Sequence, residues 1–371
     1  MTQTVVFLHS IDDSFGEREH ALRFGKGLAA AGVHPVYVVN PRMQDFFSRL
    51  GADTRCYRDA AEAVAIVDGL TPRLVVCCEY FNLLPELQRG VAGLRWPLAT
   101  MDGTTMGEPI NLNPQRTAVP LRDFTVPERM VHLRPCPVND PLPDGDGVFH
   151  WSLFPDVRRR DARRARAMFG VPRGARLVLM GVAPWARGAA THLGRMDFYR
   201  YLTDVLSGAL DAAGEPYSVI IVIGATAEGF GKLGRVLCVP LLRPDVYEEL
   251  LLGADLVVTD NVLQTSASKA LAAGVPTLAL VSSTPGAPGT PLAEPYNIFP
   301  IAVTFPTDSA YYQALAPVEI GDPAAVAARI SAIWRGEPRR GAAYFDALKR
   351  LRTPAEILAV VSPPSADGTK A

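Results

Sequence analysis

The segment Ala254–Leu280 constrains the fold more than any other part of the sequence, because a strand, a polar turn, a helix and a second strand follow one another within it. The apolar run Leu256–Val258 predicts a buried strand, and Gly274 followed by Pro276 separates the helix from the next apolar run. Hydroxyl side chains gather at the start of the helix, where backbone N–H groups and the helix dipole attract anions. The segment therefore predicts a parallel α/β unit with a turn suited to phosphate.

The same alternation of apolar runs and helical segments extends along most of the chain. Continuous apolar runs are typical of strands covered on both faces, and strands joined by helices pair in parallel with right-handed crossovers. We expect further strands at Thr4–Leu8, Val36–Val39, Arg73–Cys78, Trp96–Met101, Ala175–Met180, Tyr217–Ile223 and Arg235–Val239. We expect helices at Arg18–Ala31, Ala60–Leu70, Arg160–Phe169, Asp197–Ala213, Val246–Gly253, within Val318–Trp334 and at Ala342–Val361. The predicted fold class is α/β.

The alternation is interrupted between Gly107 and Pro155, where prolines are dense and periodicity is weak. A chain of 371 residues is long enough for two domains. We therefore expect two Rossmann-like domains facing across a cleft, at residues 1–150 and 151–335. A C-terminal helix within residues 336–362 is expected to pack back toward the first domain, and residues 363–371 are expected to form a disordered tail.

Composition and charge exclude several classes of protein. The net charge of −1 argues against a nucleic-acid partner, and the arginines of residues 158–166 are interpreted as the solvated face of a helix. The five cysteines have no metal-binding spacing and fit a reducing compartment. No apolar run approaches the roughly 20 residues of a transmembrane helix, and the N-terminus lacks the features of an export signal. We expect a cytoplasmic protein, and the high Ala, Arg, Gly and Pro content is typical of a GC-rich bacterium.

Three stretches of the sequence resemble GT-B glycosyltransferases. The best match is Ala254–Leu280, which is similar to the donor-binding segment of the lipid II N-acetylglucosaminyltransferase and of antibiotic glycosyltransferases. Its matching residues are Ala254–Val257, Thr265 or Ser266, Ser268, Ala272–Gly274 and Pro276. The run Val239–Val246 resembles the strand and turn before that segment, and Val5–Val39 resembles the first βαβ unit of the family. The resemblance implies a GT-B fold whose second domain binds a nucleotide sugar.

The sequence departs from that family at two positions of the same segment. Lys269 stands where the family carries a glutamate that binds the donor ribose, and Asn261-Val262 stands where it carries a glycine pair. Thr259-Asp260 is closer to the turn of non-hydrolysing UDP-N-acetylglucosamine 2-epimerases and teichoic-acid polymerases. These departures leave the nucleotide base and the type of reaction open. Lys269 is expected either to meet a phosphate or to lie in solvent.

The resemblance places the donor-binding residues at strand ends and helix starts of the second domain. Trp185 and Arg187 follow its first strand and are expected to cover and neutralise the donor, while a plain proline turn remains the alternative. The polar residues after Val258 exceed what one N-cap requires, which favours ligand contact over simple capping. The full set of predicted donor-binding residues is Gly181, Trp185, Arg187, Gly224, Arg243, Asp260, Asn261, Gln264, Thr265, Ser266, Ser268 and Lys269.

The first domain offers candidates for catalysis and for acceptor binding. His9 follows the first strand, where inverting GT-B enzymes often place a general base, and imidazole has a pKa suited to that role. Asp13 is expected to orient His9 or to be the base itself. Glu79 and Asp102 end two further strands, and either is expected to bind acceptor hydroxyls or to act as the base. The alternatives are a packing histidine, a helix-start carboxylate and a plain turn at Asp102-Gly103.

These features predict a glycosyltransferase that moves a sugar from a nucleotide-diphosphate sugar to a small-molecule acceptor. The Glu-x7-Glu pattern of many retaining enzymes and an Asp-x-Asp metal motif are not visible, so we expect inversion without a metal or other cofactor. Natural-product, antibiotic or cell-envelope biosynthesis fits such an enzyme, as a monomer or homodimer. The alternatives are a nucleotide-sugar 2-epimerase or hydrolase of the same fold, and a noncatalytic ligand-binding protein.

Overall fold

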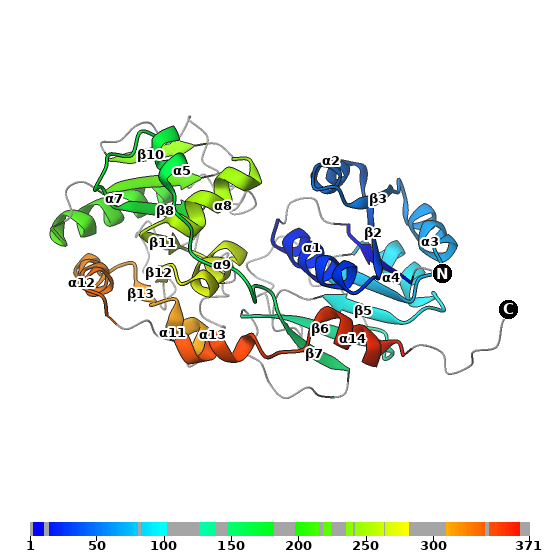
Figure 1. Cartoon of the computed structure of the whole chain (residues 1–371). Coiled ribbons are helices and arrows are strands. Elements are labelled where there is room, and N and C mark those ends of the chain that lie inside the picture. Colours follow the sequence, from blue (N-terminus) through cyan, green and yellow to red (C-terminus); the bar gives the residue numbers. More distant parts are fainter. Residues whose placement is uncertain are drawn as a thin grey trace. The chain divides into compact units, whose positions relative to one another are not determined.

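Two units built on parallel β-sheets form the computed structural model (Figure 1). It describes residues 3–10, 15–80, 83–101, 126–137, 145, 147–181, 197–214, 218–223, 235–239, 242–262, 264–281, 309–337 and 341–363, with only the backbone at 15 and 197–201. The first unit comprises the described residues up to Leu153 together with those from Ala347 onward. The second comprises the described residues from Phe154 to Asp346.

A seven-stranded parallel sheet forms the centre of the first unit. Its strands are β1 (Thr4–Leu8), β2 (His34–Val39), β3 (Asp53–Cys56), β4 (Leu74–Cys78), β5 (Leu98–Met101), β6 (Met130–Cys136) and β7 (Val148–Ser152), in the order β3-β2-β1-β4-β5-β6-β7. Its described helices are α1 (Phe15–Ala30), α2 (Pro41–Arg49), α3 (Ala60–Gly69), α4 (Pro85–Ala92) and α14 (Pro354–Val361). Because the strand order reverses direction between β1 and β4, the carboxyl ends of these two strands flank a topological switch point.

The two faces of this first sheet pack differently. Val6 and Leu8 of β1 point into a mainly aliphatic cluster that includes side chains of α3 and α4. On the opposite face Phe7 stacks on Tyr37 of β2, with 5.1 Å between ring centroids. Side chains alternate along a strand, so His9 continues the aromatic face just beyond the end of β1.

The C-terminal helix α14 packs against α1 within the first unit. A Cβ atom added at Gly27 of α1 would lie 2.7 Å from the Cγ atom of Pro354, so only glycine permits this approach. A capping box begins the helix at Thr353, and Arg73 donates from Nε to the carbonyl of Ser362 at 2.7 Å. The end of the described chain is therefore fixed to the unit in which the chain begins.

A six-stranded parallel sheet forms the centre of the second unit, in the order β10-β9-β8-β11-β12-β13. Its strands are β8 (Leu177–Gly181), β9 (Val219–Ile223), β10 (Val236–Val239), β11 (Leu256–Thr259), β12 (Thr277–Val281) and β13 (Val318–Glu319). Its described helices are α5 (Arg163–Met168), α7 (Asp197–Ala212), α8 (Pro244–Gly253), α9 (Thr265–Ala273), α11 (Ala310–Ala314) and α12 (Pro323–Trp334), and α13 (Ala342–Leu348) crosses the unit boundary. The switch point of this sheet lies between β8 and β11, which pair directly.

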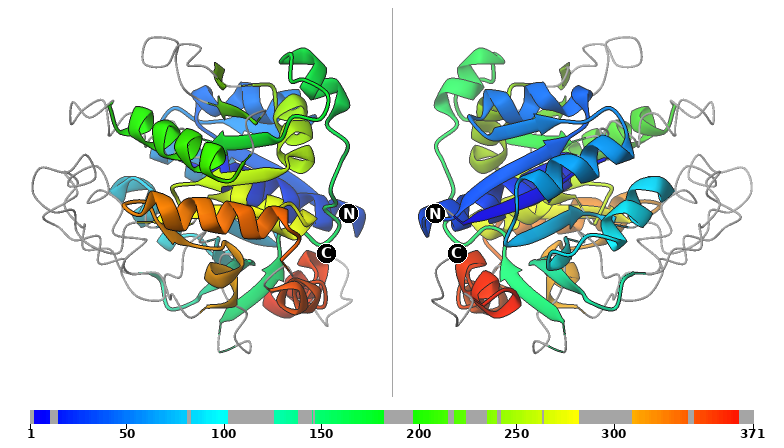
Figure 2. Two further views of the ribbon diagram at one scale, coloured as in Figure 1. Left: turned by 90° about the vertical axis from the view of Figure 1, so that its left-hand side faces the viewer. Right: turned by 90° about the vertical axis from the view of Figure 1, so that its right-hand side faces the viewer.

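Helices cover both faces of the second sheet. The helices α7 and α12 lie side by side on one face, where Val178 and Met180 of β8 join their apolar side chains (Figure 2). On the other face Leu177 and Leu179 pack with side chains of α5, α8 and α9. The continuous apolar run of β8 thus supplies both cores, which is the doubly wound arrangement.

Arginines of residues 158–166 hold the start of the second unit rather than forming a purely solvated face. Arg166 contacts the Asp255 carboxylate with 2.5 Å between Nη2 and Oδ2, and Asp255 also accepts the Leu177 amide at 2.8 Å. Arg159 donates to the carbonyl of Ala254 at 3.1 Å. The interpretation of these arginines as a solvated helix face is therefore wrong for Arg166, whose side chain is three-quarters buried.

The structure adds strands where the sequence pattern is weak and divides one predicted helix. β6 and β7 lie within the proline-rich interval in which no strand was predicted, because their polar residues interrupt the apolar run. The predicted helix Ala342–Val361 is two helices, α13 and α14. Pro354 lacks a backbone N–H and disfavours helical geometry at the preceding residue, so Thr353 begins a new helix instead.

Candidate functional site

The turn between β11 and α9 lies at the switch point of the second sheet, where ligands of open α/β sheets bind. The hydroxyl of Thr259 organises this turn: it lies 3.0 Å from the amide nitrogen of Asn261 and 2.7 Å from Oε1 of Gln264. The backbone N–H of Gln264 in turn donates to the backbone carbonyl of Asn261 at 3.0 Å. Three of the polar residues of this turn are thereby held in one hydrogen-bonded loop.

Gln264 connects the turn to the neighbouring strand β8. Its Nε2 atom donates to the carbonyl of Gly181 at 3.2 Å. A Cβ atom at Gly181 would lie 2.7 Å from that nitrogen and 3.1 Å from the hydroxyl of Tyr247. The predicted site residues Gly181 and Gln264 therefore contact one another, and a side chain at position 181 would displace the amide group of Gln264.

The N-terminus of α9 is left without a side-chain cap, because Gln264 occupies the N-cap position and turns its amide group to other partners. First-turn amides of a helix have no intrahelical acceptor, and the dipole adds positive potential there. Thr265 and Ser266, both half-buried, begin the helix. Ser266 accepts a hydrogen bond from the Tyr247 hydroxyl of α8 at 2.7 Å. This end of α9 can therefore accept an anion.

Asp260 stands at the carboxyl end of β11, where the turn that leads to α9 begins. Burial raises the pKa of its carboxyl group to about 6, and a hydrogen bond from its own backbone amide partly opposes the increase. The group is therefore partly protonated near neutral pH. A protonated Asp260 would repel a diphosphate less than an ionised one does.

Ser268 lies on the buried side of α9 and not on its exposed end. Its Oγ atom is 2.9 Å from the hydroxyl of Tyr311 in α11, which also donates to the carbonyl of Val262 at 2.8 Å. Burial raises the pKa of Tyr311, so its hydroxyl stays protonated at physiological pH. Ser268 therefore contacts protein groups in this structure.

The side chain of Lys269 does not lie in solvent, and it does not point to the N-terminus of α9. Its side chain is 9% exposed, and its Nζ atom donates to Oε2 of Glu248 in α8 at 2.7 Å. The ring of Phe154 lies 5.9 Å below the ammonium group. Glu248 also pairs with Arg160 at 3.0 Å. The expectation that Lys269 lies in solvent is wrong, and its charge joins α9 to α8 and to the segment before α5.

Replacing Lys269 with methionine is expected to reduce the free energy of unfolding by about 1–2 kcal/mol, because Glu248 loses one of its two cationic partners in a half-buried position. The affinity for a nucleoside diphosphate should not change, since the ammonium group is engaged elsewhere. Urea unfolding and calorimetric titration measure the two quantities. Glu248→Gln is the matched variant for the same ion pair. A tenfold loss of nucleotide affinity in Lys269→Met alone would place the ammonium on the ligand instead.

Arg243 occupies the exposed N-cap position of α8. It pairs with Asp245, with 2.8 Å between Nη2 and Oδ2, and both side chains are largely exposed. The hydrogen bond from Arg243 contributes to lowering the pKa of Asp245. Exposed pairs of this kind contribute little to stability, so Arg243 is free to exchange Asp245 for an anionic ligand at small energetic cost.

In the first unit, His9 lies at the carboxyl end of β1, beside the switch point of the first sheet between β1 and β4. Its side chain is 2% exposed, its Nε2 atom is 3.2 Å from the Cys78 sulfur, and its ring is 5.0 Å from that of Phe47. Burial, and then the charge of Arg18, lower the pKa of His9 to about 3. The imidazole is therefore unprotonated at physiological pH, as a base requires, but it is a weaker base than an unperturbed histidine.

Glu79 follows β4 directly and adopts a backbone conformation unusual for a residue other than glycine. Its φ angle is 59°, its side chain is buried, and its amide donates to the carbonyl of Met101 at 3.1 Å. Next to it, the amide of Tyr80 donates to Oγ1 of Thr100 at 3.2 Å. Strained backbone of this kind is concentrated at functional sites. Glu79 and His9 thus flank the same switch point, as the pairing of β1 with β4 requires.

Five predicted site residues lie outside the described part of the chain: Asp13, Asp102, Trp185, Arg187 and Gly224. Tyr247 and Tyr311, in contrast, contact the candidate donor site and are not among the site residues predicted from the sequence. Neither tyrosine belongs to a local motif. Each reaches the β11–α9 segment from another helix, so only the three-dimensional arrangement reveals it.

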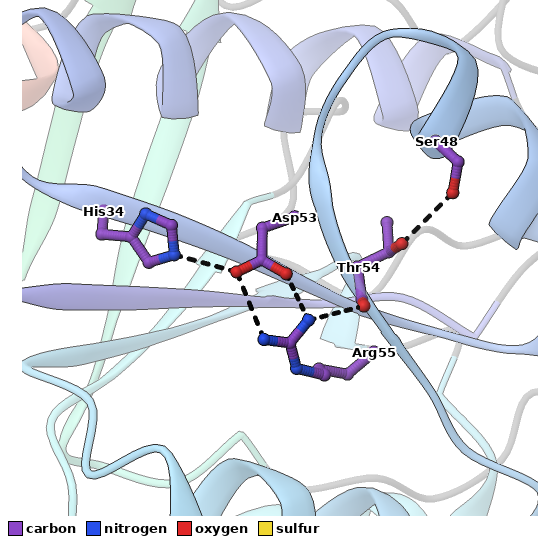
Figure 3. A network of polar contacts seen from close by, with 5 residues as sticks. All are labelled: His34, Ser48, Asp53, Thr54 and Arg55. Carbon is purple, nitrogen blue, oxygen red and sulfur yellow. Dashed lines mark hydrogen bonds and ion pairs between the residues drawn. The ribbon is translucent and has the colours of Figure 1, made fainter.

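The edge of the first sheet carries a separate polar network at the opposite end of its strands (Figure 3). Asp53 at the start of β3 accepts from Nε2 of His34 at 2.9 Å and also pairs with Arg55, while Ser48 and Thr54 lie 3.3 Å apart. His34 and Arg55 are largely exposed, and the guanidinium group of Arg55 balances the charge of the Asp53 carboxylate. The network joins the edge strand β3 to β2 and α2 and is remote from the carboxyl ends that form the switch point.

The described residues contain no group of three or more His, Cys, Asp or Glu side chains placed to hold a metal ion. Within the same residues, every helix is too short or too polar to cross a membrane.

Comparisons with known proteins identify a family and a fold. A family model described as "Family of unknown function (DUF6365)" matches residues 24–294. No curated protein matches the sequence. Among solved structures, the glycosyltransferase SsfS6 of Streptomyces sp. SF2575, complexed with thymidine diphosphate, is 16% identical, with a TM-score of 0.56 and coverage of 98% of this chain and 100% of that one.

Two spinosyn glycosyltransferases are similar over comparable lengths. The rhamnosyltransferase SpnG, complexed with spinosyn aglycone, is 14% identical with a TM-score of 0.57, covering 97% of this chain and 100% of that one. The forosaminyltransferase SpnP is 13% identical with a TM-score of 0.59, covering 97% and 98%. At these identities the likeness establishes the fold. The predicted GT-B fold, with two Rossmann-like sheets, is confirmed.

Proposed function

The chain belongs to the DUF6365 family, whose function is unknown, and we propose that it is a glycosyltransferase that uses a nucleoside-diphosphate sugar as donor. The observation that carries this proposal is the N-terminus of α9. It lies at the switch point of the second sheet, and its N-cap residue Gln264 makes no capping hydrogen bond with its side chain. Such a helix end suits a diphosphate. The GT-B fold adds support, because SsfS6 and SpnG of the same fold have been solved with thymidine diphosphate.

The proposed donor site uses groups from three elements. Backbone amides at the start of α9 and the hydroxyls of Thr265 and Ser266 would bind the diphosphate. Gly181 at the end of β8 keeps the backbone close to Gln264, and Arg243 would add positive charge from α8. Asp260, with its pKa near 6, would share a proton with the site. These groups would stabilise the leaving diphosphate by preorganised hydrogen bonds and charge, without a metal ion.

The proposed acceptor site lies at the switch point of the first sheet. His9 would accept the proton of an acceptor hydroxyl as the sugar's anomeric carbon is attacked, and Glu79 would bind a second polar group of the acceptor. SpnG, which has the same fold, has been solved in complex with spinosyn aglycone, and this supports the proposal of a small-molecule acceptor. We therefore propose a small molecule as acceptor and inversion at the anomeric carbon, in natural-product or cell-envelope biosynthesis of a bacterium.

The proposal is tested by nucleotide binding and then by turnover. Thymidine, uridine and guanosine diphosphates are added to the full-length protein, and the unfolding temperature is measured. A nucleotide that binds only the folded chain must raise this temperature. At a concentration of 100 times its Kd, it increases the free energy of unfolding by about 2.7 kcal/mol. If none of them stabilises the chain, the donor-site proposal fails. Sugar nucleotides are then incubated with and without acceptor alcohols: release of diphosphate only with acceptor supports transfer, whereas acceptor-independent conversion identifies an epimerase or hydrolase.

A further inference from the structure

Tyr311 connects the candidate donor site to α11, a helix of the second unit that is distant in the sequence. Its side chain is fully buried, and its hydroxyl lies 2.8 Å from the carbonyl oxygen of Val262 and 2.9 Å from Oγ of Ser268. Val262 belongs to the β11–α9 turn and Ser268 to the second turn of α9. One phenol group therefore bridges the turn and the helix that follows it.

The chemistry of the three groups fixes the direction of these hydrogen bonds. A carbonyl oxygen only accepts, so the single hydroxyl hydrogen of Tyr311 is donated to Val262. The Tyr311 oxygen must then accept the hydrogen of Ser268, whose other acceptor, the carbonyl of Gln264, is farther away at 3.4 Å. The result is a chain that runs from Ser268 through Tyr311 to the backbone of the turn. Chains of this kind strengthen their members cooperatively.

The helix that carries Tyr311 is itself well anchored. Ser309 caps α11 by accepting the amide of Tyr312 at 3.1 Å, and the carbonyl of Leu315 accepts the amide of Ala279 in β12 at 2.8 Å. The other described hydrogen bonds of the turn come from Thr259, Asn261 and Gln264, which belong to the same strand–turn–helix segment, and from Gln264 to β8. Tyr311 thus supplies the hydroxyl that ties the middle of the turn to the β12 side of the sheet.

We propose that Tyr311 is a positioning residue of the donor site, whose hydroxyl holds the β11–α9 turn in the conformation that presents the amides of α9 to the donor diphosphate. This inference rests on the proposed function. Tyr311 does not itself touch the donor, because it is buried behind Ser268. It acts through the backbone conformation of the β11–α9 turn, because that conformation sets the direction of the first N–H groups of α9.

The experiment compares Tyr311→Phe with the wild type in the full-length protein. The variant keeps the ring but loses the hydroxyl, so the affinity for thymidine diphosphate is expected to fall about 10-fold, since a buried carbonyl and a serine lose their partner. Calorimetric titration measures the Kd. Hydrogen–deuterium exchange measures the turn, where the amides of residues 261–268 are expected to exchange faster. Tyr312→Phe, on the same short helix, is the matched control and should retain the wild-type Kd.

Two further outcomes decide between positioning and other roles. A purely structural tyrosine would lower the unfolding temperature with an unchanged Kd, and that result would overturn the inference. Ser268→Ala, which keeps the bond from Tyr311 to Val262, should weaken binding only about 2- to 3-fold, at the low end of a hydrogen-bond deletion. An effect of Ser268→Ala larger than that of Tyr311→Phe would mean that Ser268 contacts the donor directly, which also overturns it. If the wild type binds no nucleoside diphosphate at all, the proposed function itself fails and the inference fails with it.

Discussion

Replacing Gly181 with valine is expected to weaken the affinity of the chain for thymidine diphosphate by about 100-fold. A single Cβ atom at this position would already lie 2.7 Å from Nε2 of Gln264, and valine adds two further methyl groups. The Gln264 amide would have to leave both Thr259 and the Gly181 carbonyl. Overpacking of this kind costs about 1–3 kcal/mol, and roughly 2.7 kcal/mol corresponds to 100-fold in Kd. Calorimetric titration of the full-length variant measures the effect.

Gly208→Ala provides the matched control within the same unit. Gly208 lies on the exposed side of α7, and a Cβ atom there would meet nothing within 4 Å. Alanine in an exposed helix position should leave nucleotide affinity unchanged and increase the free energy of unfolding by about 0.5–1 kcal/mol. Gly181→Ala should lie between the two, because Gln264 can move slightly at the end of its side chain. Wild-type affinity in Gly181→Val would show that the donor does not depend on the contact between β8 and Gln264.

Replacing His9 with glutamine is expected to change both the acid stability of the chain and its turnover. The folded-state pKa of His9 is about 3, against about 6.5 in the unfolded chain. Between these values the unfolded chain binds a proton that the folded chain does not, so stability falls as the pH decreases below 6.5. Between pH 7 and pH 4.5 the loss through His9 alone amounts to about 2.5 kcal/mol. Glutamine does not titrate, so the variant should lose correspondingly less over this range.

Urea unfolding of both proteins at pH 7 and pH 4.5 measures this difference. Burial also lowers the pKa of His20, which adds to the acid sensitivity, but His20 is present in both proteins and its contribution cancels. Equal losses in the two proteins would mean that His9 is solvated in the folded chain. Turnover tests the proposed base: a general base typically contributes 10²- to 10⁴-fold, so activity should fall by at least about 100-fold with donor affinity retained. Full activity of His9→Gln would rule out His9 as the base.

The sequence predicts the strands that are continuously apolar and misses those that are not. β1, β4, β8 and β11 lie within or next to runs of Val, Leu and Ile, and each lies where such a run predicts it. β3 and β6 contain Asp, Arg and His and lie at or next to the edges of the first sheet, and their pattern does not differ from that of a loop. The helices that begin at Pro41 and Pro85 were missed for a related reason, since proline at the first helical position also marks turns.

The candidate donor site is predictable only where it is local in sequence. The turn after β11 and the N-terminus of α9 follow directly from their own residues. The partners of Ser268 and Lys269 do not: Tyr311 is 43 residues away along the chain and Glu248 is 21 residues away. Without these contacts, a serine and a lysine near the start of a helix at the switch point are readily interpreted as ligand contacts. The structure shows that both side chains face the protein interior.

The return of the chain to the first unit has a consequence for the order in which the protein can fold during synthesis. The described residues of the second unit lie between Phe154 and Asp346, so they have all emerged before α14 is made. The first unit begins earlier, yet the partner of Gly27 and Arg73 is the last described helix. The domain translated first is therefore the one completed last, and a chain shortened before Thr353 would leave the surface of α1 uncovered while the other sheet is already whole.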